Sequence, residues 1–417
     1  MTDEFDDIRP YRDSEIAEAM QRISLSPYLP VLSEYVFPGV DPMLVKESLR
    51  GIATVAEFQR RVMVPANEQI IARSIKELTF SGLENVRDGR PHLLVSNHRD
   101  IMLDASLVNF IFMTHGLDST EITFGANLMK DPTVVDIGKS NKMFKVVRGG
   151  NLREFYNASK HLSAYIHHTI KEKRQSVWIA QRNGRTKDGN DTTDQGLITM
   201  FTAGGALSSG ACNGEAKASP AVSNDYEAMS SSAVPSSCEA KIESLASLGI
   251  VPVTISYEWE PCDTLKVMER YKTRLGPYIK QPGEDLNSVI VGILSPKGRV
   301  HIHFSPVLDR ETIMKTVGCG SGHFSRDIAS EIDRRIYMGY KLFPSNYIAH
   351  DFLCGNSNFR ERYTDEELEE FIRVKSRLSA FVDCDRDEIE SMYLGIYSGN
   401  VDNFERAKSR TNEHAKV

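Results

Sequence analysis

Long hydrophobic runs are absent from this sequence. A membrane-spanning helix needs about 18 consecutive apolar residues. The most apolar segment, residues 101–113, is interrupted by Asp104, Ser106 and Asn109. The N-terminus reads Met-Thr-Asp-Glu-Phe-Asp-Asp, and this acidity argues against a secretory or mitochondrial presequence. We therefore expect a cytoplasmic protein without signal peptide or transmembrane helix, which meets a membrane only at its surface.

Cysteine is scarce, and positive charge is not in excess. The six cysteines form neither a Cys-x-x-Cys pair nor a spacing typical of zinc ligands. Reduced thiols and no metal site are therefore expected. The chain has 50 Lys and Arg against 57 Asp and Glu, which gives a net charge of -7. General nucleic-acid binders are usually basic, so a nucleic acid is not expected as a partner.

Short runs of β-forming residues alternate with helical patterns between residues 81 and 310. This alternation predicts an α/β fold with a mixed, largely parallel sheet flanked by helices. The expected strands are 92–96, 121–125, 144–147, 176–180, 250–256, 288–294 and 300–304. The last two flank the turn sequence Ser295-Pro296-Lys297-Gly298, so we expect them to pair as an antiparallel hairpin.

Helical patterns lie on both sides of this domain. We expect a helical N-terminal region over residues 1–80 and a helical C-terminal region over residues 311–417. Between 203 and 238 large apolar side chains are almost missing, which predicts a disordered loop inserted in the α/β domain. The individual helices expected are 41–62, 67–78, 152–173, 323–343 and 364–382.

A histidine follows the end of the first expected strand. Leu93-Leu94-Val95 leads into His98, with Asp100 and Asp104 close behind it. At the carboxyl end of a strand, a histidine can act as a general base when a carboxylate orients its ring. A half-exposed histidine that caps the next helix is the alternative.

Two further expected strands, 144–147 and 176–180, run into cationic turns. Ligands of open α/β sheets bind outside the carboxyl ends of the strands, so these turns should lie near His98. Guanidinium groups bind phosphate through paired hydrogen bonds, and glycines let backbone N–H groups approach the oxygens. A surface ion pair is the alternative for each arginine. The positions concerned are Arg148, Arg182, Gly184, Arg185 and Lys187.

The order of these blocks resembles the glycerolipid acyltransferase family. Its first motif is a histidine, four residues and an aspartate, and its second has an arginine near a phenylalanine. Its third resembles Pro-Glu-Gly-Thr-Arg or Gly-Gly-Arg-Ser-Arg, and its fourth is a strand centred on proline. Versions of all four occur in order here, at His98 to Asp104, Phe144 to Arg148, Gly184 to Lys187 and Ile250 to Ser256.

The resemblance implies an α/β enzyme of phospholipid biosynthesis. It would move an acyl group from acyl-CoA or acyl carrier protein, as co-substrate and without a cofactor, to a glycerophosphate or lysophospholipid hydroxyl at a membrane surface. His98 would be the general base, with Asp104 or Asp100 as its partner. The phosphate ligands would be Arg148, Arg182, Gly184, Arg185 and Lys187.

Two departures from the family pattern matter. Five residues, not four, separate His98 from Asp104. On a regular helix six positions turn through about 600°, which leaves the two side chains some 120° apart. His98 must therefore lie before the helix, or Asp100 is the partner; Asp104 is preferred because its position is nearest to the motif. In the third motif the acid is missing, because Asn183 or Arg182 stands at its place.

The missing acid leaves the acceptor open and motivates a second hypothesis, a catalytically inactive lipid- or acyl-CoA-binding protein of the same fold. A thioester or phosphoester hydrolase is the third. Other candidates are weaker. His301 and His303 share one face of a strand, but no third metal ligand is evident. His167 and His168 are expected on the solvent side of their helix, and residues 318–322 form a flexible turn rather than a nucleophile elbow.

Overall fold

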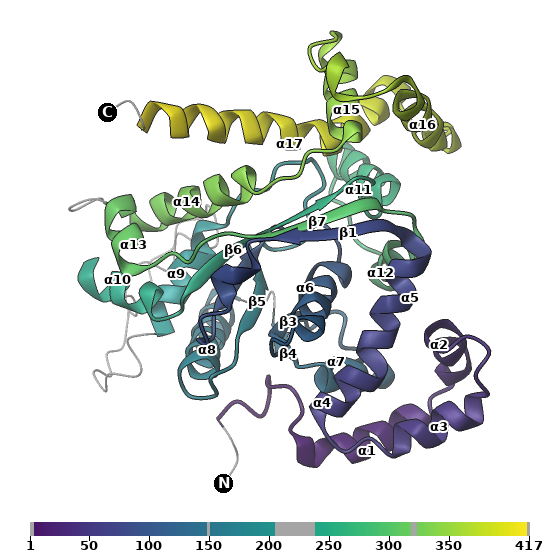
Figure 1. Cartoon of the computed structure of the whole chain (residues 1–417), viewed down its shortest axis with the longest axis vertical. Coiled ribbons are helices and arrows are strands. Elements are labelled where there is room, and N and C mark those ends of the chain that lie inside the picture. The colour runs from purple at the N-terminus through teal and green to yellow at the C-terminus, as the bar shows by residue number, and fades with distance from the viewer. Residues whose placement is uncertain (1–3, 148–150, 205–237, 318–322, 415–417) are drawn as a thin grey trace.

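The computed structural model describes residues 4–147, 151–204, 238–317 and 323–414 (Figure 1). Arg148, the turn at 318–322 and most of the loop expected at 203–238 lie outside the described residues. The predictions made for them stay predictions.

A seven-stranded sheet forms the centre of the molecule, in the order β1-β7-β6-β2-β5-β3-β4. Within the described residues, β6 and β7 are antiparallel and every other neighbouring pair is parallel. The predicted mixed, largely parallel sheet with flanking helices is therefore confirmed. The strands are β1 (Ile75–Ser81), β2 (Leu93–Ser96), β3 (Glu121–Gly125), β4 (Met143–Val146), β5 (Val177–Ala180), β6 (Ile250–Tyr257) and β7 (Gly298–Phe304).

Side chains alternate between the two faces of each strand, and each face packs under its own helices. Leu93 and Val95 of β2 enter one core, whereas Leu94 enters the other. The first face is covered by α8 (Leu152–Lys171), α9 (Gln195–Gly204), α10 (Cys238–Ala246), α13 (Arg310–Val317) and α14 (Phe324–Met338). The second is covered mainly by α5 (Val64–Ser74) and α6 (Leu103–Thr114), with α12 (Glu284–Leu294) beside them (Figure 1).

The N-terminal helices form a small core of their own. Ile16, Met20 and Phe58 are buried within it. An ion pair of 2.8 Å between Arg22 and Asp136 joins this core to α7 (Pro132–Ser140) of the α/β part. The helices are α1 (Asp13–Ser24), α2 (Leu29–Val36), α3 (Pro42–Arg50) and α4 (Val55–Phe58), which continues into a π-helical turn (Gln59–Met63).

The C-terminal helices enclose another core, built around Phe371, Tyr393 and Tyr397. Its longest element, α17 (Arg386–His414), runs beside α14 on the outer side of the sheet (Figure 1). The other helices are α11 (Asp263–Leu275), α15 (Pro344–Cys354) and α16 (Asp365–Lys375), with short 3-10 turns at Leu83–Val86, Arg360–Arg362 and Ser376–Ala380. Among the described residues, no helix has both the length and the hydrophobicity needed to cross a bilayer.

Two helices expected near the N-terminus are corrected by the structure. The expected helix 41–62 is divided, because α3 stops at Gly51 and Thr54 starts α4 with a capping box. The expected helix 67–78 ends at Ser74, because Ile75 is extended and opens β1. β1 is held by β7, from Ile75 opposite Gly298 to Ser81 opposite His303. A pairing partner so distant in sequence is invisible to local patterns.

The strand expected at 288–294 is also wrong, and so is the hairpin. These residues form the end of α12, and β7 pairs instead with β6 and β1. The β-branched residues Val289, Ile290 and Val291 favour a strand locally. However, Ser288 and Gly292 are buried, and their spacing of four residues is that of a helix face.

Candidate active site

His98 lies in the loop between β2 and α6, at the carboxyl end of the strand. The preceding Asn97 fixes this loop to β6, since its amide donates to the Ile255 carbonyl at 3.0 Å and accepts from the Ile255 N–H at 2.8 Å. The His98 side chain retains 12% of its exposure, whereas Asn97, Arg99 and Asp100 are buried. The loop therefore presents its histidine outward from a rigid base.

Asp104 is the carboxylate that contacts the ring. His98 Nδ1 lies 3.0 Å from Asp104 Oδ2, which also accepts the backbone N–H groups of Arg99 at 2.7 Å and Asp100 at 3.0 Å. The Tyr257 hydroxyl donates to Oδ1 at 2.9 Å. These donors satisfy the buried carboxylate and fix its orientation. With Nδ1 engaged, Nε2 is the nitrogen that can take a proton from a substrate.

The extra residue in the motif is absorbed by the loop, because His98 precedes the first residue of α6. Asp100 plays a different part, since its Oδ1 accepts the N–H groups of Met102 and Leu103, both at 2.9 Å, and so caps the helix. Burial, and then the charge of Asp104, raise the pKa of Asp100. Its Oδ2 lies against Gly292 of α12, where any Cβ would collide with it. Asp100 therefore supports the loop, and α12 covers its carboxyl group.

The cationic turn after β5 lies against the histidine loop. The Thr186 N–H donates to the His98 carbonyl at 2.8 Å. Gly184 adopts the left-handed φ of +75° that favours glycine and lets the turn bend there. Arg185, the next residue, is buried, and its Nη1 has no hydrogen-bond partner among the described residues. The guanidinium group lies close to the Asp100 carboxyl and the Cys262 thiol, and its unpaired nitrogen makes it a candidate anion ligand.

The other predicted phosphate ligands differ in their surroundings. Arg182 is half-buried, and its Nη1 lies 3.4 Å from the Asn190 carbonyl. Lys187 pairs with Glu269 at 2.6 Å. Arg148 lies outside the described residues, so its proximity to His98 stays a prediction. The structure thus brings His98, Asp104 and Arg185 into one region and gives Lys187 an acidic neighbour.

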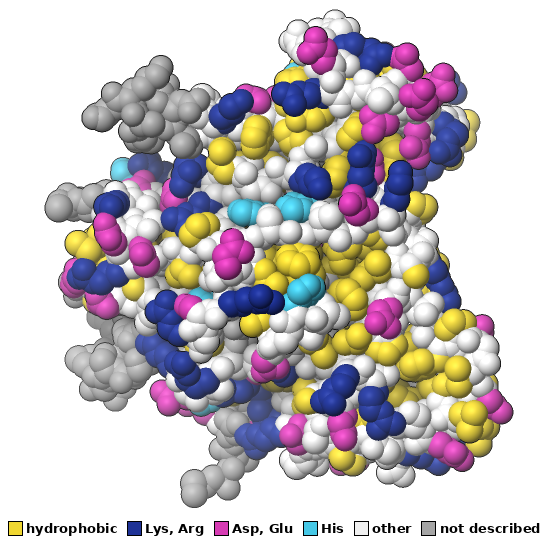
Figure 2. Space-filling view, in the orientation of Figure 1, with side chains coloured by type: hydrophobic (Ala, Val, Ile, Leu, Met, Phe, Trp, Pro, Cys, Tyr) yellow, Lys and Arg dark blue, Asp and Glu magenta, His cyan; other side chains and the backbone are white. Residues whose placement is uncertain are grey.

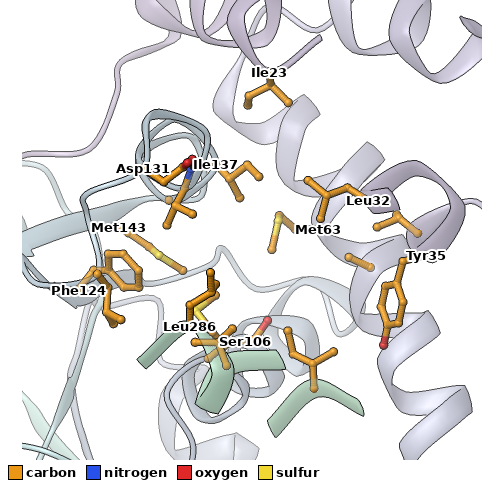
Figure 3. Close-up of a pocket in the computed structure, with 18 of the residues that line it drawn as sticks. Ile23, Leu32, Tyr35, Met63, Ser106, Phe124, Asp131, Ile137, Met143 and Leu286 are labelled. Carbon is orange, nitrogen blue, oxygen red and sulfur yellow. Dashed lines mark hydrogen bonds between the residues drawn. The ribbon is translucent and has the colours of Figure 1, made fainter. Parts of the chain in front are cut away.

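A large apolar cavity lies beside this loop. Its volume is about 770 Å³, and it lies between the N-terminal helices and the helices α6, α7 and α12 (Figure 3). Met102 and Leu103, which follow the histidine loop, form part of its wall, and Leu32 and Leu286 line it while remaining exposed. Ile23, Met63, Phe124, Ile137 and Met143 are among the side chains that surround it in Figure 3. Such a cavity suits a hydrocarbon chain.

The other histidines considered as candidates in the sequence have structural surroundings. Ser81 contacts both His301, at 3.0 Å, and His303, at 2.9 Å, and burial lowers the pKa of His301 to about 4. No group of three potential metal ligands occurs in the parts of the chain that the structure describes. The solvent-side prediction for His167 is wrong: it is buried, Nε2 contacts the Phe201 carbonyl at 2.8 Å, and burial lowers its pKa to about 4. His168 is half-buried.

Sequence reasoning missed Tyr257 and the buried side chains behind the loop. Tyr257 ends β6, one residue beyond the expected strand 250–256, so the rule that sites gather at carboxyl ends could have found it. Arg99, in the histidine loop, and Asp191, in the segment between β5 and α9, are buried charged residues. No local pattern distinguishes them from surface charges.

Two comparisons relate this chain to acyltransferases. Residues 77–207 match the family model described as Acyltransferase, and this range includes His98, Asp104 and Arg185. A search of curated proteins gives no match. Among solved structures, the 1-acyl-sn-glycerophosphate (LPA) acyltransferase PlsC from Thermotoga maritima is similar, with 12% identity and a TM-score of 0.33. The alignment covers 76% of this chain and 91% of that one.

Proposed function

We propose that this chain, whose residues 77–207 match the family model described as Acyltransferase, acylates a phosphate-bearing glycerolipid. The acyl donor is acyl-CoA or acyl carrier protein, and the acceptor hydroxyl belongs to a glycerophosphate or lysophospholipid in phospholipid biosynthesis. The observation that carries the proposal is the contact of 3.0 Å between His98 Nδ1 and Asp104 Oδ2.

The His98–Asp104 pair suits general-base catalysis. His98 Nε2 takes the proton of the acceptor hydroxyl while the oxygen attacks the thioester carbonyl. The carbonyl then reforms, the C–S bond breaks, and the leaving thiolate recovers the proton from the imidazolium. Asp104 stabilises that imidazolium and fixes the ring tautomer. Because a thioester is already activated, the transfer needs no covalent acyl-enzyme.

The cationic turn supports binding of the acceptor phosphate. Arg185 Nη1 is buried without a partner among the described residues, and the adjacent Thr186 is bonded to the His98 carbonyl. A phosphate on Arg185 would therefore be held at a fixed place relative to the base. Arg182, Gly184 and Lys187 belong to the same turn and complete the proposed phosphate site, together with Arg148 from the second motif.

The apolar cavity supports an acyl-chain site and a membrane-facing mouth. Met102 and Leu103 place its wall next to the histidine loop. Around Leu32 and Leu286, exposed apolar residues continue along α2, α3 and α12, and apolar side chains gather where α2 and α3 lie (Figure 2). An exposed apolar surface beside a lipid site is typical of proteins that dock on a bilayer. The exposed set includes Leu25, Tyr28, Val31, Met43, Leu44, Ile279, Ile290 and Leu294.

The direct test is transfer of a labelled acyl group. We expect product from acyl-CoA or acyl carrier protein only when glycerol-3-phosphate or a lysophospholipid is present. His98→Ala should lower kcat roughly a thousandfold or more, while His115→Ala, at the other end of α6, should leave it unchanged. Free fatty acid released without acceptor would indicate a hydrolase. Binding without turnover, the outcome that the missing third-motif acid motivates, would indicate an inactive binding protein.

A further inference from the structure

A buried arginine follows the histidine. Arg99 is 1% exposed, and its Nη2 donates to Asp191 Oδ2 and to Asn400 Oδ1, both at 2.5 Å. Its Nη1 lies 3.4 Å from Glu260 Oε2. Burying a guanidinium group is unfavourable unless it is paired. These three acceptors therefore fix the position of the Arg99 side chain.

Asp191 connects both neighbours of His98. It is fully buried and accepts the Asn97 amide at 3.0 Å, the Thr186 hydroxyl at 2.5 Å and the Tyr340 hydroxyl at 2.7 Å, besides Arg99. Burial alone would raise the pKa of Asp191, but Arg99 and these donors hold it below its usual range. One charged carboxylate thus holds the loop on either side of the histidine.

The C-terminal region reaches the same loop. Asn400, on α17, is buried and contacts the Arg99 guanidinium. Lys266, on α11, is buried and donates to the Arg99 carbonyl and to Glu260, both at 2.6 Å. Meanwhile the Arg99 N–H donates to the Asp104 oxygen that contacts His98. A continuous chain of contacts therefore runs from α17 to the imidazole.

We propose that Arg99 is a positioning residue, clamped between Asp191 and Asn400, which keeps the His98 ring in register with Asp104. This inference rests on the proposed function and adds that Asn400, on α17, helps to position the catalytic base. The side chain of Arg99 is sealed from solvent, so it acts through His98 and Asp104 and not on the substrate. A misplacement of the base by about 1 Å can lower a rate roughly a hundredfold.

The test variant is Asn400→Leu in the full chain, which removes one clamp but leaves Arg99 paired with Asp191. We expect kcat to fall roughly tenfold to a hundredfold, with both KM values within about twofold. A weaker Asp104 contact stabilises the imidazolium less, so the acid limb of the kcat/KM profile should move to lower pH. Asn400→Asp, which keeps the acceptor oxygen, should retain most of kcat.

Asn346→Leu is the matched control. Its buried amide donates to the Tyr397 carbonyl of α17 at 3.0 Å and does not contact the histidine loop in the described structure. Asn346→Leu should lower the melting temperature as much as Asn400→Leu does, but it should leave kcat and the acid limb of the kcat/KM profile unchanged. Where Asn400→Leu does not fold, Asn400→Ala serves the same comparison.

The pKa of His98, followed by NMR in the same proteins, reports the positioning without turnover. A lower pKa in Asn400→Leu supports the clamp. Unchanged kcat and pKa in that variant, or equal losses in Asn346→Leu, would overturn it. If the wild-type protein transfers no acyl group, the proposed function fails, and the NMR comparison still decides the positioning.

Discussion

One oxygen of Asp104, Oδ2, contacts the His98 ring and also accepts two backbone N–H groups of the loop that carries His98. This pairing could be predicted, since the spacing from His98 already preferred Asp104 over Asp100. The Tyr257 hydroxyl donates to the same carboxylate from 153 positions away. Its place at the end of a strand could be predicted, but its contact with Asp104 could not, because only the folded sheet brings the two residues together. The contact between Asn400 and Arg99, 301 positions apart, could not be predicted either. Motifs therefore reveal the reacting groups, while the groups that orient them come from distant parts of the fold.

Arg185 should determine the affinity for the acceptor. Arg185→Lys keeps the charge but loses the fork that matches phosphate. We expect the KM of the acceptor to rise roughly tenfold, and that of the acyl donor to stay within about twofold. Steady-state kinetics with each substrate varied in turn measures both. Arg174→Lys, at the opposite end of β5, is the control. An unchanged acceptor KM in Arg185→Lys would remove it from the phosphate site.

At the scale of elements, strands with a local apolar signature were predictable, whereas the edge strand β1 and the helix α12 were not. The runs at 92–96, 121–125 and 176–180 coincide with β2, β3 and β5 to within a residue. The sequence did not predict β1, because this strand depends on pairing with β7. It did not predict the end of α12, because that segment is rich in β-branched residues but packs as a helix. Tertiary context overrides propensity in both cases.

The packing of α14 against the turn after β5 should make stability depend on pH. Asp333 of α14 accepts the Thr193 N–H at 2.7 Å, and burial raises its pKa to about 7. A carboxyl group whose pKa is higher in the folded than in the unfolded state stabilises the folded protein at low pH. This contribution to the free energy of unfolding is lost as the pH rises from about 4 through 7. The loss is at most about 4 kcal/mol.

Urea denaturation at pH 5 and pH 8 checks this expectation. The free energy of unfolding should fall more between the two pH values in the wild-type protein than in Asp333→Asn, which cannot ionise. His167, whose pKa burial lowers to about 4, has the opposite sign and cancels in the difference between the two proteins. Equal falls in both would mean that Asp333 does not carry the effect.

At the scale of the whole molecule, the cavity arises where the N-terminal helices dock on the α/β domain. No sequence pattern could predict it, because neither part encloses the space alone. Leu32 of α2 and Leu286 of α12 line the cavity and are exposed, and both helices carry apolar side chains on the surface. The resemblance to lipid enzymes implies a membrane surface as partner, and our proposal assigns that contact to these exposed side chains.

Docking on a bilayer should depend on α12. We expect the wild-type protein to float with vesicles of phosphatidylcholine and phosphatidylglycerol in equal amounts. Ile290 and Leu294 are 47% and 57% exposed, and a buried apolar side chain contributes about 1.5–3 kcal/mol. Ile290→Glu with Leu294→Glu should therefore weaken binding at least roughly tenfold. Val382→Glu, on a highly exposed residue of the C-terminal region, is the control; equal flotation of all three proteins would contradict this docking surface.

The strand order also governs how the chain is built. β1 is made early, but its partner β7 begins only at Gly298. A nascent chain that ends before that residue leaves β1 without its neighbour, and an unpaired strand is a template for aggregation. Contacts of this sequence separation also slow folding. The ribosome must therefore synthesise most of the polypeptide before β1 can pair with its neighbour in the sheet.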